Sequence, residues 1–157
     1  MQHVISGERA AVEAALSILE EDHFVQGVVI ERRVPMHSSH FAPVADAFRP
    51  ALERAAWKAA RRPYLPNVYG RPVEAPAATD LIEALSLHVH RPVLWRDSVE
   101  LLADRFADAV FVEVGPRAVL HNLLNRKWLP NRKHKTDSSG DLHSHFAALV
   151  EELADAS

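Results

Sequence analysis

The 157-residue sequence contains no cysteine. This absence excludes disulfide bonds, thiolate metal sites and a cysteine nucleophile, and it fits a reducing compartment. No apolar run approaches the roughly 18 residues that a membrane-spanning helix needs, and the N-terminus lacks the charged-then-apolar pattern of a signal peptide. We therefore expect a cytoplasmic protein that does not enter a membrane.

Neither sign of charge dominates the sequence. The 18 Lys and Arg residues and 21 Asp and Glu residues give a formal net charge of -3. Such a chain produces no strong field that would attract nucleic acid or an anionic membrane. With 48% hydrophobic and 25% charged residues, its composition is that of an ordinary globular domain with a sizeable core.

Apolar periodicity predicts alternating strands and helices, and therefore an α/β chain. The expected strands cover residues 2–6, 28–30, 64–69 and 109–114, and the expected helices cover residues 8–21, 41–62, 79–89, 95–106 and 119–124, with a last helix from Asp141. Pro50 predicts a kink or break in the helix that contains it. The polar and basic stretch 125–140 is expected to be a surface loop.

The segment most suited to catalytic chemistry is Val-Pro-Met-His-Ser-Ser-His-Phe at positions 34–41. His37 stands there between a predicted strand and a predicted helix, and histidine suits proton transfer because its pKa lies near neutrality. Spacing alone favours a structural histidine, hydrogen-bonded at a strand end. Ser38 and Ser39 are nucleophile candidates by proximity only; because the glycines of a nucleophile elbow are missing, we expect them to cap the helix ahead of Phe41.

Other candidate residues carry weaker signals. The histidine pairs are His37 and His40, His88 and His90, and His143 and His145. None has the i, i+4 spacing with an intervening glutamate that marks a helical zinc site, so we expect surface histidines and no metal. Glu113 could be a third member of a catalytic triad, but a buried carboxylate paired with backbone or arginine is the plainer interpretation. The three tryptophans, Trp57, Trp95 and Trp128, are expected to be packing residues.

Five short segments in a fixed order resemble a known family. They are Val4-Ile5-Ser6-Gly7, Val34-Pro35-Met36-His37-Ser38, Tyr64-Leu65-Pro66-Asn67-Val68, Arg91-Pro92-Val93-Leu94-Trp95, and Phe111-Val112-Glu113-Val114-Gly115-Pro116-Arg117-Ala118-Val119-Leu120. The last matches a Val-Glu-x-Gly-Pro-x-x-x-Leu signature. Together they resemble the C-terminal half of malonyl-CoA:acyl-carrier-protein transacylases, a family that includes the acyltransferase domains of polyketide and fatty-acid synthases.

The resemblance implies a partial α/β-hydrolase-like acyltransferase domain, with part of its small ferredoxin-like subdomain at the N-terminus. The implied divisions are residues 1–33 for the subdomain, 34–125 for the acyltransferase core, and 126–157 for a basic loop and C-terminal helix. In such an enzyme His37 would be the general base, and the backbone carbonyl of His88 would orient it. Met36, which is bulky, would favour malonyl as the transferred group.

The implied reaction moves an acyl group from CoA to an acyl carrier protein through an acyl-serine. Acyl-CoA is then the substrate, the phosphopantetheine of the carrier protein is the acceptor, and no cofactor is bound. The expected partners are the carrier protein and an N-terminal acyltransferase half or a larger synthase, with no nucleic acid and no membrane.

The sequence contains no Gly-x-Ser-x-Gly, the segment that holds the nucleophilic serine in this family. The segment that helps to form the oxyanion hole and the arginine that binds the malonyl carboxylate also belong to the half that is not represented. We therefore expect the chain alone to be inactive. The alternative is a non-catalytic module derived from an acyltransferase, which only binds a synthase partner or carrier protein.

Overall fold

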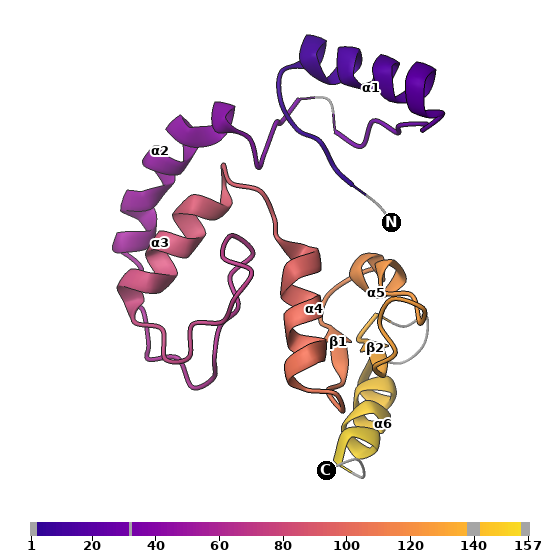
Figure 1. The fold of residues 1–157 in the computed structure, drawn as a ribbon. Coiled ribbons are helices and arrows are strands. Elements are labelled where there is room, and N and C mark those ends of the chain that lie inside the picture. Colours follow the sequence, from indigo (N-terminus) through magenta and orange to yellow (C-terminus); the bar gives the residue numbers. More distant parts are fainter. Residues whose placement is uncertain (1–2, 32, 138–141, 155–157) are drawn as a thin grey trace. The chain divides into compact units, whose positions relative to one another are not determined.

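A computed structural model describes residues 3–31, 33–137 and 142–154 (Figure 1). The elements in chain order are α1 (Arg9–His23), the 3-10 helix η1 (Ser39–Phe41), α2 (Ala42–Glu53), α3 (Ala78–His88), α4 (Trp95–Arg105), β1 (Phe111–Glu113), α5 (Val119–Leu123), β2 (Lys133–Lys135) and α6 (Leu142–Ala154). None of the helices in these described ranges has the length and apolarity needed to cross a membrane.

The chain forms two compact units, which meet in sequence between Ser98 and Val99. The first contains α1 to α3, and the second contains both strands, α5 and α6. The domain boundaries expected after residues 33 and 125 remain predictions.

The first unit is built on the packing of α2 against α3, which lie side by side (Figure 1). Ala45 and Leu52 of α2 and Ile82 and Ala84 of α3 are buried in its core. Positions 82, 84 and 86 of α3 are all buried although they point in different directions around the helix, so α3 is enclosed on more than one side.

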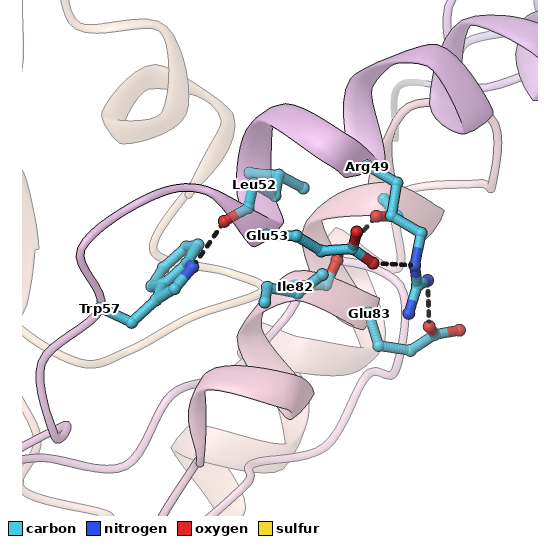
Figure 2. Close-up of polar contacts among 7 residues, drawn as sticks. Arg49, Leu52, Glu53, Trp57, Ile82 and Glu83 are labelled. Atoms are coloured by element: carbon cyan, nitrogen blue, oxygen red, sulfur yellow. Dashed lines mark hydrogen bonds and ion pairs between the residues drawn. The ribbon is translucent and has the colours of Figure 1, made fainter.

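Polar contacts fix the end of α2 (Figure 2). Arg49 donates to Glu53 of its own helix at 3.1 Å and to Glu83 of α3 at 2.7 Å, and these pairs are exposed. The indole of Trp57 donates to the carbonyl of Leu52 at 2.7 Å. The expectation that this helix reaches residue 62 was wrong, because α2 ends at Glu53, one turn after Pro50.

The expected early strands are absent from the described residues. Residues 3–6 and 28–30 form no strand, Gln2 lies outside the described residues, and Tyr64 makes a single antiparallel bridge to Val73 where a strand over 64–69 was expected. A strand forms only when a second backbone completes its hydrogen bonds, and no described segment pairs as a strand with residues 3–6 or 28–30. Their apolar side chains are left exposed, with Val4 at 75% and Val28 at 83%.

The second unit contains the one sheet among the described residues, a parallel pair in which Phe111 of β1 is opposite Lys133 of β2. The strand β2 lies within residues 125–140. The expectation that this whole stretch is a surface loop was therefore wrong. Lys133 shows why its polar sequence can form a strand. Its ammonium group donates to the carbonyl of His121 at 2.7 Å and to that of Leu124. Its positive charge therefore stabilises the carbonyl end of α5.

Candidate functional site

His37 occupies a tight turn between Pro35 and the short helix η1. Its φ of 60° lies in the left-handed region, which is uncommon for a residue other than glycine. Pro35 has a fixed φ and disfavours a helical conformation at Val34, and the chain then turns at positions 36 and 37 before η1 begins. Non-glycine residues held at positive φ concentrate at functional sites, where the surrounding structure maintains the strain.

The C-terminal end of α3 holds His37 by two hydrogen bonds. The backbone N–H of His37 donates to the carbonyl of Val89 at 3.0 Å, and the ring Nδ1 lies 2.8 Å from the carbonyl of His88. The last carbonyls of a helix have no partner within the helix, so His37 satisfies two groups that would otherwise need water. The partner of Nδ1 in this pair was expected from the sequence, whereas its role in orienting a catalytic base remains a prediction.

This geometry determines which nitrogen of His37 can act. A carbonyl oxygen can only accept, so Nδ1 carries the proton and Nε2 presents a lone pair. The arrangement is that of a general base whose second nitrogen is oriented by the backbone.

The ring of His88 lies directly beside that of His37. Their centroids are 4.9 Å apart and their planes are nearly perpendicular, at 87°. Partial burial lowers the pKa of His88 below its usual value, and the charge of His37 acts in the same direction. His88 is therefore a neutral neighbour at physiological pH.

Asn67 completes this cluster and was not identified from the sequence. Its side-chain nitrogen lies 3.4 Å from Nδ1 of His88, and its backbone carbonyl accepts from the N–H of Leu94 at 2.7 Å. It belongs to the Tyr64-Leu65-Pro66-Asn67-Val68 segment, which sequence reasoning treated as a strand. A single polar residue, Asn67, inside an otherwise apolar segment was the only signal that could have drawn attention to it.

Ser38 is not arranged as a nucleophile. Its side chain is buried and its hydroxyl donates to the carbonyl of Pro35 at 2.6 Å. The hydroxyl proton is therefore bonded to the backbone and not directed at a catalytic base. The expected side-chain capping was also wrong, because neither η1 nor α2 receives a capping hydrogen bond from a side chain. Ser39 is exposed within η1, and Met36, the expected selectivity residue, is 39% exposed next to His37.

Glu113 stabilises a helix terminus in the second unit. Its carboxylate accepts from the backbone N–H of Leu120 at 3.1 Å and of His121 at 2.8 Å, at the start of α5. The bond from His121 is the main reason that the pKa of Glu113 lies below its usual value. The pairing with backbone confirms that part of the plainer interpretation, whereas the expected burial was wrong, because Glu113 is only partly buried. The pairing also explains why a glutamate is followed closely by a Gly-Pro turn and a helix.

Where the structure describes their side chains, the remaining histidine candidates form no metal site. The described residues contain no group of three or more His, Asp or Glu side chains that could hold a metal ion. The side chains of His143 and His145 lie outside the described residues.

Comparison with known proteins places this histidine site in context. The chain is 30% identical over 145 residues to the malonyl CoA-acyl carrier protein transacylase of Bacillus subtilis, covering 90% of this chain and 34% of that protein. It is 36% identical over 123 residues to the squalestatin hexaketide synthase of a Phoma species, covering 74% of this chain and 5% of the synthase. The chain is a homologue of part of the malonyl-CoA:acyl-carrier-protein transacylases.

A solved transacylase has the same fold over most of this chain. It is a malonyl-transacylase in complex with the acyl-carrier protein of a type II polyketide synthase; it matches with a TM-score of 0.76 and 23% identity, over 92% of this chain and 45% of its own. No protein-family model matches the chain. This chain thus spans 34% of the length of the Bacillus subtilis transacylase and 45% of the length of the solved transacylase. The chain therefore has the fold of the matched part of a transacylase, whereas the division into hydrolase-like and ferredoxin-like parts remains a prediction.

Proposed function

We propose that this chain supplies the general base of an acyltransferase that moves an acyl group, malonyl by preference, from CoA to an acyl carrier protein. The observation that carries the proposal is the hydrogen bond between Nδ1 of His37 and the carbonyl of His88, which leaves Nε2 free. Homology to transacylases supports the same assignment. Met36 beside His37 would contribute to the choice of malonyl, because its side chain is bulky and partly exposed at the turn.

The proposed reaction needs a serine, and these 157 residues contain none in a Gly-x-Ser-x-Gly segment. A second half that bears Gly-His-Ser-x-Gly, on a separate chain or in a larger polypeptide, would complete the site. In the first step, Nε2 of His37 takes the proton of that serine as its oxygen attacks the thioester carbonyl of malonyl-CoA. The C–S bond breaks, and the departing CoA thiolate takes the proton from the imidazolium.

The second step returns the acyl group to a thiol. His37 removes the proton of the phosphopantetheine thiol of the carrier protein, and the thiolate attacks the acyl-serine carbonyl. The C–O bond breaks and the serine oxygen recovers the proton from His37. The two half-reactions balance without a metal or other cofactor. We place this reaction in the cytoplasm, as expected from the sequence.

Two features of the described residues support a fold that is completed by further polypeptide. Parallel sheets are normally covered and have several strands, yet β1 and β2 form only a pair, and their outer edges are unpaired among the described residues. Val4, Val28 and Ile30 are at least 75% exposed. These features equally favour the alternative, a module that binds a synthase partner without catalysing transfer.

Reconstitution separates the two functions. The chain would be combined with a polypeptide that bears the Gly-His-Ser-x-Gly half, and transfer of malonyl from malonyl-CoA to holo-carrier protein would be measured. His37→Ala should lower the rate by about 10²- to 10⁴-fold, the usual contribution of a general base. His40→Ala, at an exposed position three residues away, is the matched control and should leave the rate unchanged.

Two results would contradict the proposal. A malonyl adduct detected by intact mass on the isolated chain would show a nucleophile within these residues. Transfer that is unaffected by His37→Ala would favour the non-catalytic module.

A further inference from the structure

The His37 ring is restrained on two sides by one residue. The carbonyl of His88 holds Nδ1, and the side chain of the same His88 makes an edge-to-face contact with the ring. A single hydrogen bond fixes one atom of an imidazole but lets the ring swing about that atom. Edge-to-face packing against a second ring removes this remaining freedom, because it fixes the angle between the two planes.

The His88 ring is itself restrained by Asn67. The amide nitrogen of Asn67 is directed at Nδ1 of His88, and an N–H can donate there only if that nitrogen is unprotonated. His88 is then neutral with its proton on Nε2, in agreement with the lowered pKa that burial causes. The Asn67 backbone is fixed independently, by the bond from Leu94 to its carbonyl.

We infer that Asn67 and the side chain of His88 are positioning residues, which hold the His37 imidazole in its Nδ1–H tautomer with Nε2 free. Asn67 orients the His88 ring, and the His88 ring sets the plane of the His37 ring. In that plane the Nδ1–H of His37 points at the His88 carbonyl and donates to it. The consequence for transfer rests on the proposed function, whereas the positioning itself is a property of this chain.

The tautomer of His37 is the direct measure of this positioning. It can be read from long-range ¹H–¹⁵N correlation spectra of the full 157-residue chain, recorded above the titration range of histidine. The unaltered chain should show the Nδ1–H tautomer at His37. Asn67→Ala and His88→Ala should both give a mixture of tautomers, although both keep the backbone carbonyl at position 88.

Two further variants test whether Asn67 acts through the ring at position 88. His88→Phe keeps a ring of similar width but has no nitrogen for Asn67, so the plane of that ring is no longer fixed, and the variant should give the same mixture of His37 tautomers as Asn67→Ala. In that background, Asn67→Ala should have no additional effect, because its amide then has no ring nitrogen to orient. His40→Ala is the control for loss of a nearby exposed imidazole and should leave the His37 spectrum unchanged.

One result overturns the inference: His37 remains fully in the Nδ1–H tautomer in Asn67→Ala, in a chain whose circular dichroism is unchanged. The backbone carbonyl alone would then set the tautomer. Asn67→Ala decides this even if His88→Ala fails to fold, because the bond from Leu94 to the Asn67 carbonyl does not involve the side chain.

Activity gives a second readout with its own meaning. In the reconstituted acyltransferase, Asn67→Ala should lower kcat by about two- to tenfold, the rate equivalent of one aromatic contact, and leave the KM for malonyl-CoA unchanged. If the tautomers shift as expected but transfer does not depend on His37, the proposed function fails and the positioning stands. If His37→Ala abolishes transfer but Asn67→Ala changes neither kcat nor tautomer, the positioning fails and the function stands.

Discussion

Replacing His37 by glycine should give a more stable chain than replacing it by alanine, the reverse of the usual order. His37 has a φ of 60°, and its Nδ1 bonds the carbonyl of His88. Both substitutions lose that side-chain bond, which is worth about 0.5–1.5 kcal/mol. Only alanine retains a Cβ in the left-handed region, where an L-residue costs roughly 1–2 kcal/mol.

The two costs predict the size of the difference. The strain relieved by glycine is offset in part by its greater freedom in the unfolded chain, about 0.5–1 kcal/mol. The glycine variant should therefore be about 0.5–1 kcal/mol more stable than the alanine variant. At a urea dependence of about 2 kcal/mol/M, this is a difference of about 0.3–0.5 M between the two unfolding midpoints.

Urea unfolding followed by circular dichroism measures this difference. The same glycine and alanine pair at His40 is the control, since His40 is exposed and is not among the residues at positive φ. At His40 alanine should be at least as stable as glycine. An alanine variant at position 37 that equals or exceeds the glycine variant would show that the turn relaxes on substitution, and the argument from backbone strain would be refuted.

Three further predictions concern stability elsewhere in the chain. The hydrogen bonds to Glu113 lower its pKa, so its contribution is present above the ordinary carboxyl pKa and is lost as pH falls through the lowered value; E113Q should remove this part of the pH dependence of urea unfolding between pH 7 and 3, and an unchanged pH profile would contradict it. Phe24 ends α1 with a φ of 54° and is 90% exposed, so Phe24→Gly should raise the free energy of unfolding by up to about 1 kcal/mol, whereas a loss of stability would mean that the exposed ring packs in solution. The amide of Asn131 donates to three backbone carbonyls after α4, at 2.9, 3.1 and 3.4 Å, so Asn131→Ala should lower the thermal midpoint, with a cost of about 1–3 kcal/mol, and an unchanged midpoint would show that water replaces the amide.

Most helices could be predicted from the sequence because their signals are local, although α2 ends at Glu53 and not at residue 62. The 3.6-residue period placed α1 at 8–21 against the observed Arg9–His23, and α4 at 95–106 against Trp95–Arg105. Among the described residues, the strand expected at 109–114 is confirmed as β1 (Phe111–Glu113), whereas the other strands could not be predicted in the same way, because a strand depends on a partner that can be distant in sequence. Residues 28–30 have the apolar composition of a strand and form none, whereas the basic residues of β2 pair with β1.

The candidate site was predictable only as far as the resemblance reached. Position and residue type identified His37, and the resemblance supplied the His88 carbonyl, 51 residues away in sequence. The contact between the two rings and the approach of Asn67 depend on side-chain directions around the end of α3. Periodicity contains no information on such contacts between a turn, a helix terminus and a separate segment.

The parallel pair of β1 and β2 also gives a means to follow assembly. In a parallel ladder each strand directs half of its amides to its neighbour and half to the opposite side, so a two-strand sheet leaves one row of amides unbonded along each outer edge. Hydrogen exchange should be slow for amides between the strands, such as that of Phe111, and fast for those along the outer rows. Addition of a polypeptide that extends the sheet should slow the exchange of one outer row and leave the inner row unchanged, which would report on which edge the second half binds before any activity is measured.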